Sequence, residues 1–225
     1  MSEMLKIDHI CKTFNAGTIN EKVALNGVDL TLEDGDFVTV IGGNGAGKST
    51  TLNAVAGVWP VDSGKIYIGG DDVTKLSEYK RAKYLGRVFQ DPMTGTATTM
   101  SIEENMAIAA RRGKKRGLTW GITKEERDTY RELLKTLDLG LEDRLTSKVG
   151  LLSGGQRQAI TLLMASIQKP KLLLLDEHTA ALDPKTAAKV LEISDKIIAE
   201  NHLTAMMVTH NMKDAITHGN RLIMM

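Results

Sequence analysis

The sequence predicts an α/β fold with a mostly parallel central sheet. Two short apolar runs, residues 37–41 and 172–175, have the length and composition of strands that are buried on both faces. A glycine-rich segment follows the first run directly, and the carboxylates Asp176 and Glu177 follow the second. Glycine and polar residues at the carboxyl ends of buried strands are typical of parallel sheets whose connections are helices.

Other segments predict an antiparallel layer beside this sheet. Residues 5–14 and 23–32 alternate between apolar and polar side chains, as strands with one solvent-facing side do. Residues 64–70, bounded by glycines, and residues 84–89 are expected to be further strands.

The middle of the chain, residues 91–150, is predicted to be helical. Tyr130, Leu133, Leu134 and Leu137 form a stripe at i, i+3, i+4 and i+7, and residues 101–104 have the composition of a helix start. The basic run at residues 111–116 is expected to lie in a solvated loop, with contact to anionic lipid as the alternative. Trp59 and Trp120 are assigned to packing.

The glycine-rich segment fits the pattern G-x-x-x-x-G-K-[ST] of a phosphate-binding loop. Its backbone N–H groups can form an anion nest at a helix N-terminus, where the helix dipole also favours negative charge. Lys48 would reach the β- and γ-phosphates of ATP, and the Ser49 hydroxyl would bind Mg²⁺. A tight turn without a ligand is the alternative, which the preceding strand disfavours. The residues expected to contact the nucleotide are Gly42, Gly43, Asn44, Gly45, Ala46, Gly47, Lys48, Ser49 and Thr50.

The two carboxylates after the second apolar run complete a hydrolytic site. Because the carboxyl ends of parallel strands meet at one edge of the sheet, Asp176 and Ser49 can share one Mg²⁺. Glu177 is the candidate general base for the attacking water. Alternatively, the two carboxylates could cap the following helix. The sequence therefore predicts a protein that binds and hydrolyses ATP.

Composition narrows the function further. The net charge of +1 argues against a broad nucleic-acid-binding surface. The sequence has no apolar run of 18 residues and no signal peptide, so we expect a soluble, intracellular chain that reaches a membrane only through a partner. The single cysteine, Cys11, excludes an internal disulfide, fits a reducing compartment, and is expected to be a small buried hydrophobic residue.

A third motif, Leu152-Ser153-Gly154-Gly155-Gln156, lies between the phosphate loop and Asp176. With these three motifs in order, the chain from Leu5 to its end resembles the nucleotide-binding subunits of ATP-binding-cassette (ABC) proteins. The resemblance implies a P-loop NTPase with a RecA-like core sheet, an antiparallel β subdomain and an inserted α-helical subdomain. One domain would span residues 1–225, with the core at 1–90 and 157–225 and the helical subdomain at about 91–156.

The resemblance also assigns site residues. Phe14 corresponds to the aromatic that stacks on adenine, Gln90 to the Q-loop glutamine, Asp183 to the D-loop and His210 to the switch histidine. The alternatives are a core aromatic for Phe14, a surface amide for Gln90 and a structural role for His210. Lys48, Gln90, Glu177 and His210 would be catalytic, and Ser49, Gln90 and Asp176 would bind the metal. The remaining nucleotide contacts, from the opposite protomer, would be Ser153, Gly154, Gly155 and Gln156.

The same resemblance implies partners. The chain would form a homodimer around two ATP molecules with Mg²⁺, and it would power permease subunits from the cytoplasmic face of the membrane, with an extracytoplasmic solute-binding protein and without nucleic acid. An exporter ATPase and a soluble cluster-assembly ATPase are the alternatives. His178 and Gly43 replace prolines that are common in the family, as in bacterial importers assigned to tryptophan or tyrosine. A titratable His178 beside Glu177 is expected to make turnover depend on pH.

Overall fold

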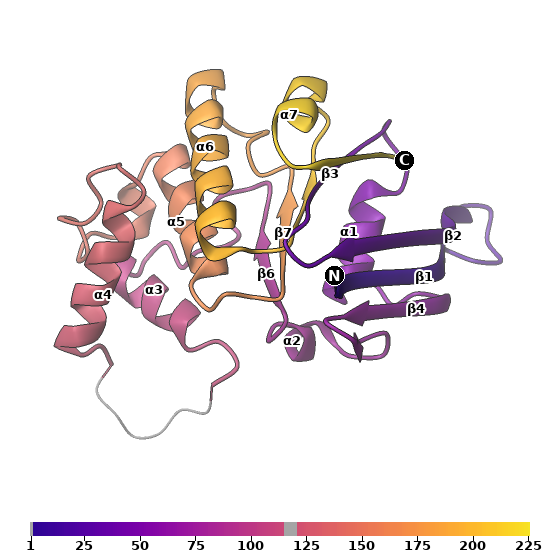
Figure 1. Cartoon of the computed structure of the whole chain (residues 1–225), viewed down its shortest axis with the longest axis horizontal. Helices are drawn as coiled ribbons and strands as arrows, with labels where there is room; N and C mark the ends of the chain where they lie inside the picture. The colour runs from indigo at the N-terminus through magenta and orange to yellow at the C-terminus, as the bar shows by residue number, and fades with distance from the viewer. Residues whose placement is uncertain (1, 115–120) are drawn as a thin grey trace.

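The computed structural model describes residues 2–114 and 121–225, and in it two sheets stand beside a group of helices (Figure 1). The strands are β1 (Glu3–Phe14), β2 (Lys22–Glu33), β3 (Phe37–Ile41), β4 (Ser63–Ile68), β5 (Asp71–Asp72), β6 (Leu85–Val88), β7 (Leu172–Asp176), β8 (Ala205–Val208) and β9 (Arg221–Met224). The helices are α1 (Lys48–Ala56), α2 (Glu78–Arg81), α3 (Ile102–Ala110), α4 (Lys124–Lys135), the 3-10 turn η1 (Val149–Leu151), α5 (Gly154–Ser166), α6 (Pro184–Asn201) and α7 (Met212–Thr217).

The central sheet is parallel, with the order β6-β7-β8-β3-β9. β7 lies between β6 and β8, and β3 lies between β8 and β9, so both strands that precede the predicted site are interior strands. The predicted α/β class and buried parallel strands are therefore confirmed. The second sheet has the order β2-β1-β4-β5 and is antiparallel, as expected.

Each face of the parallel sheet contributes to a different hydrophobic cluster. Along β7, Leu172 and Leu174 pack with α1 and the antiparallel sheet, whereas Leu173 and Leu175 pack with residues of α3 to α6. All four leucines have no exposed surface. This alternation follows from the period of two in a strand, and it explains why the run is apolar without a break.

The helices between β6 and β7 form the side of the molecule away from the antiparallel sheet (Figure 1). α3 begins at the predicted position, where Ser101 and Glu104 form a reciprocal capping box. In α4, Tyr130 and Leu134 face the core, and Leu137 is buried although it follows the last helical residue. Residues 115–120, including Trp120, lie outside the described residues.

The basic run is less solvated than expected in its described part. Arg111 donates to both carboxylate oxygens of Glu126 at 3.0 Å, and the half-buried Arg112 donates to the carbonyl of Ala165 at 3.4 Å. Burial lowers the pKa of Arg112. These arginines attach the end of α3 to α4 and α5, so the prediction of a fully solvated loop is wrong at these two positions.

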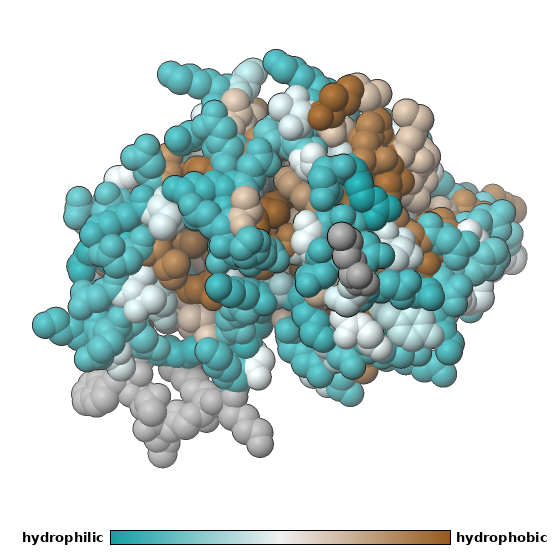
Figure 2. Space-filling view, viewed as in Figure 1, coloured by the Kyte–Doolittle hydropathy of each residue, from teal (hydrophilic) through white to brown (hydrophobic). Residues whose placement is uncertain are grey.

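The face seen in Figure 2 is mostly hydrophilic, with hydrophobic residues near α7 and the C-terminus and also among the helices on the left of the view. Within the described ranges, no helix has both the length and the apolar character needed to cross a membrane. Cys11 is half-buried and accepts the N–H of Gly27 at 3.2 Å, so the expectation of a fully buried cysteine is corrected.

Candidate active site

The glycine-rich segment connects β3 to α1 in the way that the motif requires. Gly47 caps α1 with φ of 96°, a conformation that side chains other than glycine rarely adopt. A Cβ at this position would approach the carbonyl oxygen of Ala24 at 2.9 Å, so both the backbone angle and the space demand glycine. Gly45 also has a positive φ, of 85°, which favours glycine at this position. The first N–H groups of α1 have no partner within the helix, and such groups can bind an anion.

Lys48 is buried at 6% exposure at the start of α1. Its ammonium group donates to the carbonyl oxygens of Gly42 at 2.8 Å and Gly43 at 3.1 Å. These contacts hold the cation inside the loop, where it can neutralise phosphate charge.

A hollow of about 200 Å³ lies over this loop. Its walls combine the antiparallel sheet with the carboxyl end of β7, because Phe14, Lys22 and Ala24 come from β1 and β2 and Glu177 follows β7. The phosphate loop forms the floor with Asn44, Gly45, Ala46, Gly47, Lys48, Ser49 and Thr50. Lys22 is a charged residue that the sequence analysis missed. It is the register partner of Phe14, so the expected antiparallel pairing could have indicated it.

Asp176 ends β7 at the same edge of the sheet. Burial raises the pKa of this carboxyl, and the Arg87 guanidinium opposes that shift through an ion pair of 3.3 Å between Nη2 and Oδ2. The sequence analysis also missed Arg87, which no motif marks.

The residues present suit Mg²⁺, because carboxylate and hydroxyl oxygens are ligands that this ion prefers. No group of three or more His, Cys, Asp or Glu residues in the described part of the chain could hold a metal by itself. Asp176 and Ser49 would therefore share the ion with phosphate oxygens and water.

Glu177 and His210, two of the predicted catalytic residues, lie in contact. Oε2 of Glu177 is 3.3 Å from Nδ1 of His210. The contact arises because β7 and β8 are neighbours and both residues follow their carboxyl ends. The Glu177 side chain is 21% exposed and lines the hollow over the phosphate loop, whereas His210 is 60% exposed and does not line it.

His178 lies in the core, 1% exposed, with Nε2 at 3.0 Å from the Ser194 hydroxyl of α6. Burial lowers the pKa of His178 to about 4, with a smaller contribution from His218. His178 is therefore neutral at physiological pH, and the expectation that its titration controls turnover is corrected.

Gln90 lies just beyond β6, and its side chain is exposed. It does not line the hollow over the phosphate loop.

Phe14 is half-buried at the edge of that hollow, and its ring makes a T-shaped contact with the ring of Trp59, with 5.0 Å between the centroids and 82° between the planes. Phe14 is therefore not a core aromatic, and Trp59 packs as expected.

The signature residues lie apart from the hollow of their own chain. Ser153 caps α5 and forms a capping box with Gln156, while Gly155 is buried where a Cβ would overlap the Thr186 methyl group. Asp183 caps α6 by accepting the N–H of Thr186 at 3.1 Å. Hydrogen bonds from Thr186 lower the pKa of Asp183. None of the signature residues or Asp183 lines the hollow over the phosphate loop.

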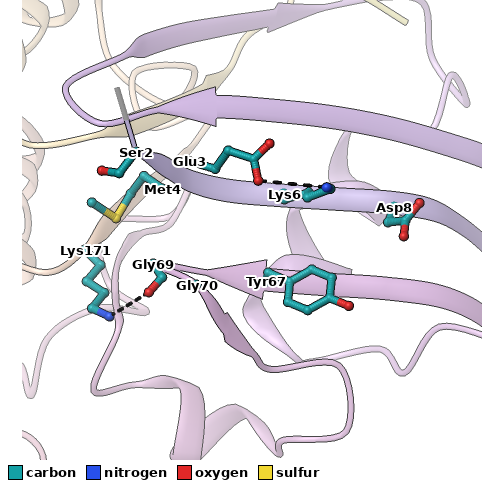
Figure 3. A pocket seen from close by; sticks show the side chains of 9 residues that line it. All are labelled: Ser2, Glu3, Met4, Lys6, Asp8, Tyr67, Gly69, Gly70 and Lys171. Carbon is teal, nitrogen blue, oxygen red and sulfur yellow. Dashed lines mark hydrogen bonds and ion pairs between the residues drawn. The ribbon is translucent and has the colours of Figure 1, made fainter.

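A larger hollow of about 590 Å³ lies at the opposite end of β1 (Figure 3). Its polar side chains already pair locally: Lys6 contacts Glu3 at 3.9 Å, and Lys171 donates to the carbonyl of Gly69 at 3.3 Å. Lys171 precedes β7, so this hollow lies at the amino edge of the parallel sheet. Nothing in its lining matches the motifs above.

Comparison with known proteins decides the family. The profile of the ABC transporter family matches residues 25–180. This chain belongs to that family. A tyrosine transport ATP-binding protein of Clostridioides difficile (strain R20291) is 44% identical over 222 residues, covering 99% of this chain and 88% of that protein. The lipoprotein-releasing system ATP-binding protein LolD of Ruegeria sp. (strain TM1040) is 36% identical over 219 residues, covering 95% and 92%.

A solved structure agrees along almost the whole chain. The dimeric ATP-binding cassette MJ0796, in a post-hydrolysis state bound to ADP and Pi, matches with a TM-score of 0.81 and 31% identity, covering 99% of this chain and 94% of that chain. The predicted P-loop NTPase fold and the predicted activity are confirmed: this ABC transporter family member is an ATPase.

Proposed function

We propose that this ATPase powers a membrane importer for an aromatic amino acid such as tyrosine. The 44% identity to a tyrosine transport ATP-binding protein supports the transported solute, together with His178 and Gly43 at positions where the family commonly has proline. The chain would act at the cytoplasmic face of the membrane, joined to permease subunits and served by an extracytoplasmic solute-binding protein.

The contact between Glu177 and His210 beside the phosphate loop carries the proposed mechanism. Lys48 and the loop N–H groups bind the β- and γ-phosphates of ATP and stabilise charge on the transferring phosphoryl group. Glu177 orients and activates the attacking water, and His210 fixes the position of that carboxylate. Ser49, Asp176 and Gln90 would hold Mg²⁺, which would supply further charge stabilisation when bound.

A shared site is supported by the observation that none of the signature residues lines the hollow of its own chain. Two chains related by a two-fold axis would each place Ser153, Gly154 and Gly155 over the phosphate loop of the other, an isologous interface. ATP would hold the two chains together, and cleavage would release them. Asp183 would lie at the same interface, and Phe14 would stack on adenine.

Replacement of Glu177 by glutamine tests the mechanism. Glu177→Gln keeps the size of the side chain but removes the base, so we expect ATP binding to persist, hydrolysis to fall by at least about a hundredfold, and an ATP-bound dimer to accumulate. ATPase assays and gel filtration with Mg²⁺ and ATP measure this. Glu192→Gln, an exposed position on α6, is the matched control and is expected to behave like the unmodified chain. Normal hydrolysis by Glu177→Gln would mean that another group activates the water.

The transport assignment needs a separate test. We expect affinity purification of this chain from its own membranes, in detergent with ATP, to recover a polytopic permease identifiable by mass spectrometry. The same purification with Lys48→Ala, which removes the phosphate-binding cation, controls for nucleotide dependence. Recovery of soluble partners alone, with ATPase activity intact, would favour the cluster-assembly type of ATPase. A recovered permease that transports its solute outward would favour an exporter.

A further inference from the structure

Arg87 lies beneath the proposed metal site. It belongs to β6, the neighbour of β7, and its side chain is only 14% exposed. Its Nη2 atom contacts Oδ2 of Asp176 at 3.3 Å. The Asp176 side chain is also mostly buried, at 18% exposure, so the pair is shielded from water and less screened than a surface ion pair.

The same Nη2 atom also reaches α1. It donates to Oδ1 of Asn53 at 2.8 Å, and the Nδ2 group of Asn53 donates to the carbonyl of Ser49 at 2.8 Å. A continuous chain of contacts therefore runs from Asp176 through Arg87 and Asn53 to Ser49. Its two ends are the residues proposed to bind the metal, and they come from β7 and α1. Arg87 also lies on the strand that leads into Gln90, the third proposed metal contact.

This arrangement costs stability. Nε of Arg87 is buried and, within the described part of the chain, has no hydrogen-bond partner. A buried donor without a partner is unfavourable, and an apolar side chain at a position between buried strands would avoid that cost. The guanidinium is 4.6 Å from the ring centroid of Phe89, a cation–π contact that offsets part of it. Buried polar groups that lack a hydrogen-bond partner occur preferentially at functional sites.

We infer that Arg87 is a positioning residue of the nucleotide site, which ties Asp176 to the helix that begins at the phosphate loop. Arg87 holds Oδ2 of Asp176 and leaves Oδ1 for the metal, and through Asn53 it keeps Ser49 in register with that oxygen. The inference rests on the proposed binding of Mg²⁺ by Ser49 and Asp176.

Charge and position predict opposite effects at Arg87. A cation next to Asp176 repels a second cation, so an arginine that acted only through its charge would weaken metal binding, and its removal would tighten it. If Arg87 instead orients Asp176, its removal should weaken metal binding, because loss of such outer contacts typically lowers metal affinity roughly tenfold or more.

The test measures the affinity of a non-hydrolysable ATP analogue by calorimetry, once with Mg²⁺ and once with EDTA. Mg²⁺ is expected to raise the affinity of Arg87→Met for the analogue by a factor roughly tenfold smaller than in the unmodified chain. The affinity in EDTA is expected to be unchanged. Arg87→Lys keeps the charge, but its shorter side chain does not extend to the position of Nη2, so we expect a partial loss. Asn53→Ala breaks the link to α1 alone and is expected to act in the same direction, which keeps the test valid should Arg87→Met fail to fold.

The matched control is Arg221→Met. Arg221 begins β9 and pairs at 2.6 Å with Asp36, which precedes β3, so this ion pair lies at the amino edge of the sheet. The phosphate loop follows the opposite, carboxyl end of β3. Loss of Arg221 is therefore expected to leave the gain from Mg²⁺ unchanged. An unchanged or larger gain in both Arg87→Met and Asn53→Ala would overturn the inference alone. Absence of any gain in the unmodified chain would overturn the metal assignment and the inference with it.

Discussion

At the scale of single residues, the site depends on an unusual backbone conformation. Glu177 has φ of 45°, a left-handed angle that costs a residue with a side chain about 1 kcal/mol or more. The hydrogen bond from its N–H to the carbonyl of Val208, at 2.9 Å, and the burial of the next residue, His178, hold it there. The strained residue is the one that contacts His210, as expected where strain serves function.

Lys22 gives the first residue-scale prediction. Its ammonium group lines the hollow over the phosphate loop but is exposed, so its attraction to a triphosphate is partly screened. We expect Lys22→Met to weaken ATP binding about fivefold at low salt, which corresponds to one screened charge pair. Fluorescence titration with a labelled ATP analogue at two salt concentrations measures the loss and its decrease with salt.

Lys65→Met is the control for this prediction. Lys65 is an exposed lysine on β4 that does not line the hollow, so its removal changes the net charge equally without changing the site. Equal losses for the two variants would show that Lys22 acts only through the overall charge of the chain.

At the scale of elements, the C-terminal end of α1 depends on a buried arginine. Arg81 is 2% exposed and donates to the carbonyls of Ala54 at 2.6 Å and Val55 at 2.8 Å. It also donates to Leu76 at 3.0 Å and Thr74 at 2.9 Å. A cation at this end of a helix also complements the dipole whose positive end lies at the phosphate loop.

We therefore expect Arg81→Met to lower stability by about 3 kcal/mol, because several buried carbonyl groups lose their donor. For a chain of this size the melting temperature should fall by roughly 6 to 12 °C, measurable by circular dichroism. Arg131→Met, which breaks an exposed pair with Asp128 on α4, is expected to cost less than about 1 kcal/mol. A similar small loss for Arg81→Met would mean that water replaces its hydrogen bonds.

The elements also show what a sequence can predict here. The strands at residues 37–41 and 172–175 and the helix start at Ser101 follow from local patterns, because burial and capping leave marks within a few residues. The contact of Arg87 with Asp176 joins residues 89 positions apart, and it exists only because β6 and β7 are neighbours. Pairing of strands that lie far apart in the sequence depends on topology, so no local pattern predicts it.

The buried environment of His178 has the same origin. The sequence shows an imidazole beside a carboxylate, whereas the fold places it against Ser194 of α6 and excludes water. Capture of a side chain by a distant helix is a tertiary effect, which is why the sequence predicted a titrating group and the structure shows a neutral one.

At the scale of the whole molecule, His178 couples folding to pH. Its folded pKa of about 4 lies below the ordinary value of 6.5, so the unfolded chain binds the proton more readily. The resulting stability is fully present above about pH 6.5 and is lost as the pH falls through about 4. This difference corresponds to a loss of up to about 3 kcal/mol between these values.

Urea unfolding at several pH values between 4 and 7 tests this coupling. His178→Gln can keep a hydrogen bond to Ser194 but takes up no proton, so the decline of its unfolding free energy over this range should be shallower than that of the unmodified chain by up to about 3 kcal/mol. Carboxylates common to both proteins, such as Asp36 with its lowered pKa, cancel in the comparison. Parallel curves for the two proteins would show that His178 can be protonated within the folded chain. The hydrolysis rates of the two proteins at pH 7 would then show whether the imidazole of His178 also affects Glu177.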